Sequence, residues 1–167
     1  FSKTRVLQFA VPKLFVNKGK WWLWKRSAAD QTWRRMYRYD LRNTNVTDIV
    51  AQAQSYEYKF TPELKSPGDL KADYAFIVDT EVPIIKSLEL KKNKEGQMRI
   101  EWNITEKHLK TGGIVITIYG KKGSVLGTHA TTNKNGGIPV NRDHKKVMSA
   151  IDIEVVDRAA NRVNKRL

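Results

Sequence analysis

Large apolar residues occupy every second position in two short segments near the middle of the chain. In residues 55–61 and 74–78 these positions hold Tyr56, Tyr58, Phe60, Tyr74, Phe76 and Val78. A period of two is typical of a β-strand that buries one of its two faces. Pro67-Gly68-Asp69 lies between the segments and has the residue types that turns use. The pattern therefore predicts two half-buried β-strands on either side of a turn.

The second half of the chain repeats this alternation more regularly. In residues 98–104 one strand face takes the apolar side chains of Met98, Ile100, Trp102 and Ile104. Residues 114–119 and 151–155 are further apolar segments, and turn sequences that contain glycine separate them. Short strands at this spacing favour β-sandwiches over an α/β fold. We therefore predict an all-β chain of two tandem β-sandwiches, the first of which is incomplete or irregular.

A short polar stretch marks the boundary between the two predicted sandwiches. Its sequence is Asp-Thr-Glu-Val-Pro at residues 79–83, and a new alternating pattern begins directly after it. Because proline restricts the conformation of the residue before it, Pro83 should limit bending at Val82. We therefore place the first domain at residues 1–79 and the second at residues 80–167.

Composition excludes several classes of protein. The chain has 167 residues, of which 40% are hydrophobic and 29% charged, as in a soluble folded protein. No apolar run approaches the roughly 20 residues that a membrane helix needs, so no membrane span is expected. Cysteine is absent, which excludes disulfides and thiolate-bound metals. Because the chain begins at Phe1 rather than at a methionine, we interpret it as a fragment or a processed piece.

The chain is strongly basic, with a formal net charge of +14. Residues 1–50 and residues 81–167 carry +8 each, and residues 51–80 carry −2. Such a balance favours anionic partners, namely nucleic acid, wall polymers or anionic glycans. A surface that is charged only for solubility explains the balance equally well. Charge alone leaves both interpretations open.

Aromatic and basic residues interleave in the first domain. Alternation puts Trp22 and Trp24 on one strand face, where a sandwich core would bury them, and leaves Trp21 outside. Rings and guanidinium groups at the surface can stack on sugars or on the bases of a single strand. The candidate surface-binding residues are Trp21, Arg34, Arg35 and Arg38.

Groups that could perform catalysis are sparse. His108, His129 and His144 show no metal-binding spacing, and none lies beside a serine–glycine elbow. Asp157 and Asn161 flank a short turn, but calcium sites usually come from a denser acidic loop. We expect these two residues to accept local backbone hydrogen bonds. The sequence therefore predicts no catalytic residue, no metal site and no cofactor in this segment.

Three segments resemble a known family. They are YEYKFTP at residues 56–62, YAFIVDTEVP at residues 74–83 and IDIEVVDRAAN at residues 151–161. Together they are similar to the fibronectin type III-like region of bacterial cell-envelope subtilisin-like proteases, which include lactocepins and streptococcal complement-cleaving peptidases. The resemblance covers roughly residues 20–163. The chain departs from the family at Ala160, where glycine is usual, so that turn must differ or be strained here.

The resemblance implies fibronectin type III-like, immunoglobulin-like sandwiches that carry no active site. The chain would be a C-terminal accessory or spacer segment of a secreted serine endopeptidase on the bacterial cell wall. Its partners would be the catalytic module of that protease or its protein substrate. Two alternatives stay open: a basic binding module for an anionic polysaccharide or, less favoured, for nucleic acid, and an adhesin or wall-spacer pair without a protease.

Overall fold

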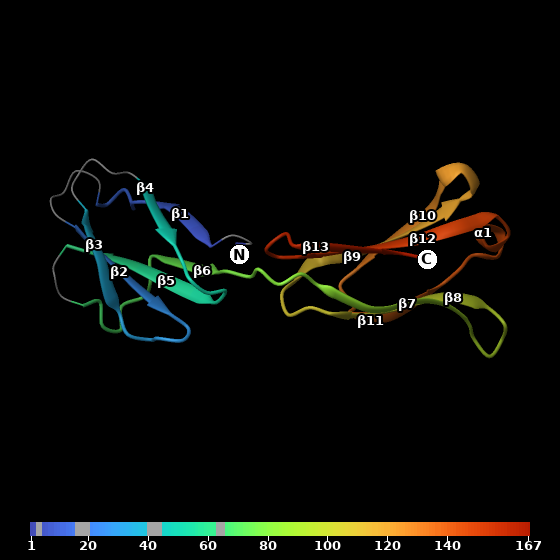
Figure 1. Cartoon of the computed structure of the whole chain (residues 1–167), viewed down its shortest axis with the longest axis horizontal. Helices are drawn as coiled ribbons and strands as arrows, with labels where there is room; N and C mark the ends of the chain where they lie inside the picture. Colours follow the sequence, from blue (N-terminus) through green and yellow to red (C-terminus); the bar gives the residue numbers. More distant parts are fainter. Residues whose placement is uncertain (3–4, 16–20, 40–44, 63–65) are drawn as a thin grey trace. The chain divides into compact units, whose positions relative to one another are not determined.

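The computed structural model describes residues 1–2, 5–15, 21–39, 45–62 and 66–167. The chain divides into two compact units, Phe1–Thr80 (unit 1) and Glu81–Leu167 (unit 2). Both are built from antiparallel strands, so the all-β sandwich prediction is confirmed (Figure 1). Among the described residues, no helix has the length and apolar character of a membrane span.

Unit 1 contains two sheets. Its strands are β1 (Val6–Ala10), β2 (Trp21–Ser27), β3 (Arg34–Tyr39), β4 (Asn45–Ile49), β5 (Ser55–Thr61) and β6 (Tyr74–Ile77). One sheet pairs β1 with β4, and the other has the order β3-β2-β5-β6 (Figure 1). Proline and glycine at residues 67–68 form the predicted turn, in which the Leu70 N–H donates to the Pro67 carbonyl over 3.1 Å.

The core of unit 1 lies between its two sheets. Tyr56, Tyr58 and Phe60 of β5 are at most 4% exposed, as their alternation predicted. They pack against Leu7 and Phe9 of β1 in one cluster of buried residues. Full burial of a side chain of this size contributes about 1.5–3 kcal/mol, so these aromatic residues stabilise unit 1 substantially.

Unit 2 also has two sheets, of three and four strands. Its elements are β7 (Ile84–Lys92), β8 (Met98–Thr105), β9 (Leu109–Gly120), η1 (Lys121–Gly123), β10 (Val125–Thr131), β11 (Asn135–Pro139), α1 (Arg142–Val147), β12 (Met148–Asp157) and β13 (Arg162–Arg166). The sheets have the orders β11-β8-β7 and β10-β9-β12-β13 and face each other as two layers (Figure 1).

The predicted inward face of β8 is the core face. Ile100, Trp102 and Ile104 are at most 5% exposed, and Met98 is partly buried. From the opposite sheet, β9 and β12 each contribute a row of buried aliphatic residues to the same cluster. Ile153 in the middle of β12 is fully buried. Alternation in sequence therefore identified both layers of this sandwich.

Candidate functional site

Trp21 lies on the core face of β2, so the expectation that it is at the surface was wrong. Its side chain is 6% exposed, and its ring centroid is 4.0 Å from that of Phe15. The pairing of β2 with β5 sets this face, because Leu23 lies opposite Phe60 and both belong to the core. Residues two apart in a strand share a face, so Trp21 points inward with Leu23.

Trp22 and Trp24 lie on the other face of β2, not on the core face that we expected for them. Trp24 is nevertheless 7% exposed, and its Nε1 donates to Thr61 Oγ1 over 2.9 Å. Trp22 is half-buried and faces Arg35, whose guanidinium carbon is 5.0 Å from the ring centroid. This outer face is therefore covered by contacts within the unit.

The buried Trp33 binds the turn at residues 67–69 through a hydrogen bond within unit 1. Its Nε1 donates to the Gly68 carbonyl over 2.9 Å. The guanidinium group of Arg26 lies 4.6 Å above the Trp33 ring and also pairs with Glu57. Aromatic and cationic groups thus meet here as the sequence suggested, but they hold the fold together rather than face an open surface.

Of the predicted surface arginines, the structure describes the side chains of Arg34 and Arg35, and each contacts a neighbour within unit 1. The Arg34 side chain is 79% exposed and pairs with Asp30, whose carboxylate also accepts a hydrogen bond from the Thr32 N–H. This backbone bond is the main cause that lowers the pKa of Asp30, and Arg34 adds to it. Arg35 is exposed and covers Trp22. Arg38 lies in β3, and its side chain falls outside the described part of the chain.

A charged cluster inside unit 1 escaped the sequence analysis. Lys25 Nζ lies 2.7 Å from Asp48 Oδ2, and the Tyr58 hydroxyl donates to the same oxygen. Asp48 is 7% exposed and Tyr58 is fully buried. The ammonium group also lies 4.8 Å from the Tyr56 ring centroid. Burial and the bond to Asp48 raise the pKa of the Tyr58 hydroxyl well above its usual range.

The strand register explains why these charges are inside. Lys25 lies opposite Tyr58 in the pairing of β2 with β5, so it shares the core face. Asp48 lies on β4 between the buried residues Val46 and Val50. The spacing in the sequence could have revealed this cluster. The lysine is two residues after Leu23, and the aspartate is two residues from each of two buried valines, so each shares a strand face with core residues.

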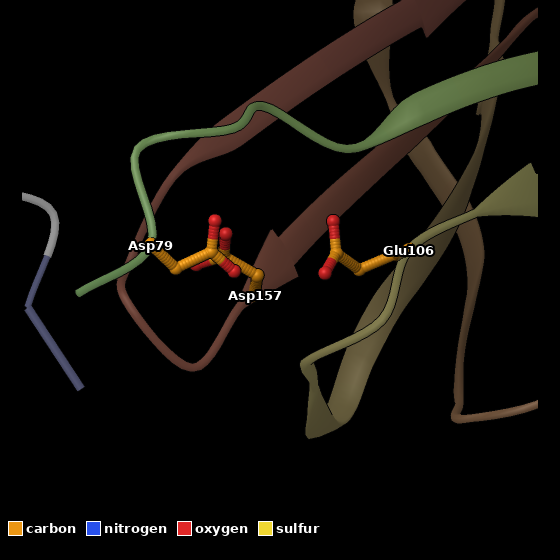
Figure 2. A group of neighbouring side chains, drawn as sticks. All are labelled: Asp79, Glu106 and Asp157. Carbon is orange, nitrogen blue, oxygen red and sulfur yellow. The ribbon is translucent and has the colours of Figure 1, made fainter. Parts of the chain in front are cut away.

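Two carboxylates lie together in unit 2 where β12 ends. Asp157 is fully buried. Its carboxylate accepts one hydrogen bond from the Asn161 backbone N–H over 2.9 Å and another from the Asn161 side-chain Nδ2 over 2.8 Å. The bond from the Asn161 N–H confirms the role expected of Asp157, whereas the Asn161 side chain donates to Asp157 instead of accepting a backbone bond from it. A carboxylate oxygen of Glu106 lies within 4.8 Å of a carboxylate oxygen of Asp157. Both side chains are drawn in Figure 2. Figure 2 also labels Asp79, which belongs to unit 1 and whose N–H donates to the Ser2 carbonyl.

An open basic pocket lies beside α1 in unit 2, and its volume is about 700 Å³. Its cationic lining residues are Arg142, Lys145 and Lys146, and Glu95 is its one acidic lining residue. In the part of the chain that the structure describes, none of the three cations forms an ion pair. The pocket is thus a positively charged concave surface that the sequence analysis did not identify.

The comparisons with known proteins found neither a matching family model nor a matching curated protein. Among solved structures, the chain is similar to a β-glucuronidase from Ruminococcus gnavus in complex with D-glucaro 1,5-lactone, with 10% identity and a TM-score of 0.32. The same enzyme in complex with D-glucuronic acid gives 11% identity and a TM-score of 0.33. Each match covers 97% of this chain but only 35% of the enzyme chain. Similarity at this level carries no argument about the activity of this chain.

Proposed function

We propose that this chain is a non-catalytic accessory and spacer segment of a secreted cell-surface protein. Following the resemblance at residues 56–83 and 151–161, that protein is a subtilisin-like serine endopeptidase of the bacterial cell envelope. The two sandwiches position its catalytic module and contact its substrate or host surface. The chain itself does no chemistry in this proposal.

One observation supports the proposal most strongly. Three aromatic side chains that could have formed a binding surface are used for packing. Trp21 packs against Phe15 with tilted rings, Trp24 donates a hydrogen bond to Thr61, and Trp33 donates one to Gly68. A ligand would have to break these contacts to reach the rings. Each such side chain instead adds buried apolar area, which a spacer needs in order to stay folded outside the cell.

The hairpin in the third resembling segment supports a structural role as well. Asp157 uses both of its carboxylate oxygens on Asn161, which closes the connection between β12 and β13. Ala160 in this connection has a φ of 64°. The turn therefore keeps a positive φ at the position where the resembling family has glycine, although this chain has alanine there.

Deletion of the segment from the whole surface protein tests the proposal. We expect a protein without residues 1–167 to hydrolyse a short soluble peptide at the parent rate, and to lose cleavage of a large protein substrate at the cell surface. The matched control replaces the segment with two unrelated sandwich domains, which should restore part of that cleavage. Loss of short-peptide hydrolysis on deletion would contradict the proposal, since the segment would then belong to the catalytic machinery.

A second candidate function is binding of an anionic polysaccharide, and the basic pocket beside α1 favours it. Three cations that pair with no acidic group among the described residues line a concave surface there, which concentrates positive potential. If they bind a polyanion, retention of the chain on heparin should fall when Arg142, Lys145 and Lys146 are all changed to glutamate. The control is the same change at Lys107, Lys110 and Lys121, which do not line the pocket. Equal loss of retention in both variants would refute a specific site.

A further inference from the structure

The partly buried contact between Lys25 and Asp48 brings together two groups that can condense. A primary amine and a carboxyl group face each other over 2.7 Å, from β2 in one sheet and β4 in the other. The core of unit 1 holds both strands in place. Leu23 lies two residues before Lys25 and Val46 two residues before Asp48, and both are fully buried. Groups that a fold holds side by side react as if at a raised concentration, and the effective molarity reaches about 10⁵–10⁸ M when their orientation suits the attack.

The ion pair is largely removed from water, although the Lys25 side chain remains 22% exposed. Asp48 is 7% exposed and lies between two sheets, and the rings of Tyr56 and Tyr58 flank the ammonium group at 4.8 and 5.9 Å. Removing two charges from water is costly unless further hydrogen bonds compensate them. An amide would keep the link between the strands while it removes both charges from the core.

Tyr58 is placed to assist such a reaction. Its hydroxyl donates to Asp48 Oδ2, the oxygen on which negative charge develops when an amine attacks the carboxyl carbon. The side chain is fully buried, so its hydroxyl is held in place before the reaction begins. Burial and the nearby carboxylate raise the pKa of this hydroxyl, which therefore stays a hydrogen-bond donor.

We propose that Lys25 and Asp48 condense into an intramolecular isopeptide bond that joins β2 to β4. The ammonium group first passes one proton to the carboxylate, which leaves a neutral amine beside a neutral acid. Nζ then attacks Cγ, and the carbonyl electron pair moves onto Oδ2, to which Tyr58 donates. A second proton leaves Nζ with the Oδ1 hydroxyl, the Cγ–Oδ1 bond breaks, and one water molecule departs. One N–H remains in the amide, and no oxidant or cofactor is consumed.

A second lysine–aspartate pair in unit 1 provides a control. Lys59 Nζ lies 2.8 Å from Asp73 Oδ1, a distance close to that of the first pair. Asp73 also accepts a hydrogen bond from the Phe60 backbone N–H. Lys59 lies opposite Trp24, on the outer face of the four-stranded sheet, so this pair does not lie between two sheets. We therefore expect it to remain an ion pair.

Intact-mass spectrometry of the full chain under denaturing conditions tests the proposal. The wild-type chain should be lighter than its sequence mass by one water molecule, and the Lys59→Met variant should show the same deficit. Lys25→Met and Asp48→Ala should each have the full sequence mass. After trypsin digestion, a branched product should join residues 21–26 to residues 43–59, because cleavage fails at the modified Lys25.

Two results would overturn the proposal. A wild-type chain at its full sequence mass would show that the two groups form only an ion pair, whatever the variants do. A water deficit that persists in Lys25→Met would show that dehydration occurs elsewhere in the chain. Denaturation breaks an ion pair and leaves a covalent bond intact. The branched tryptic product is read on the wild-type chain, so the assignment of the bond to Lys25 and Asp48 does not depend on whether a variant folds.

Discussion

Replacing Ala160 with glycine should stabilise unit 2. Ala160 has a φ of 64°, in the left-handed region that favours glycine. It follows Asp157 in the connection to β13, where its N–H donates to the Asp157 carbonyl over 3.2 Å. Its methyl group is exposed to solvent, so removing it sacrifices no packing. The substitution therefore relieves backbone strain without making a cavity.

The magnitude follows from two opposing effects. A left-handed conformation costs an L-residue about 1–2 kcal/mol relative to its preferred region. Glycine loses more backbone entropy on folding than alanine, which offsets about 0.5–1 kcal/mol of that gain. The net stabilisation of Ala160→Gly therefore lies between about 0 and 1.5 kcal/mol, with a midpoint of about 0.75 kcal/mol. For a domain of this size, the midpoint raises Tm by about 3–6 °C.

Thermal unfolding of unit 2, followed by calorimetry, measures the effect. Ala159→Gly is the matched control, because Ala159 is 6% exposed and is not among the residues with positive φ. That variant loses a buried methyl group as well as backbone entropy, so it should unfold about 1 kcal/mol more easily. If both variants were destabilised alike, the argument from strain at Ala160 would be refuted.

Three further substitutions test the packing of the two units. Gly136→Ala would place Cβ 2.5 Å from Trp102 Cζ2. The substitution should therefore lower the free energy of unfolding by about 1–3 kcal/mol, as measured by urea titration. An unchanged urea midpoint would contradict this contact. Ile153→Ala removes most of a fully buried side chain, so it should lower the free energy of unfolding by about 2–5 kcal/mol in the same titration. A change within experimental error would mean that this core is loosely packed. Folding raises the pKa of Tyr58, so its contribution to stability is complete below about pH 10 and is lost at more alkaline pH. Tyr58→Phe should therefore show a smaller fall in unfolding free energy between pH 8 and pH 11 than wild type, and equal falls would contradict this account.

The strands were predictable because alternation is a local property. In β8 the apolar residues recur at every second position, and three of the four are at most 5% exposed. In β5 the same period predicted three buried aromatic side chains. In both strands only one face is apolar, so the pattern itself shows which face is buried.

The face of β2 was not predictable in the same way. Trp21, Trp22, Leu23 and Trp24 are all apolar, so alternation separates two sets of side chains without showing which set enters the core. The partner strand decides, because Leu23 pairs with Phe60 and brings its own set inside. For the same reason the sequence analysis did not predict that Lys25 lies on the core face of β2. A contact between residues far apart in sequence is needed to resolve such a strand.

The proposed function depends most directly on whether a catalytic domain precedes Phe1. Peptide mass mapping of the full-length protein, purified from its source, can show whether it does. The account predicts an upstream subtilisin-like catalytic domain with a Gly-Thr-Ser-Met-Ala-type motif around its nucleophilic serine. A full-length protein that carries no such domain would contradict the protease assignment.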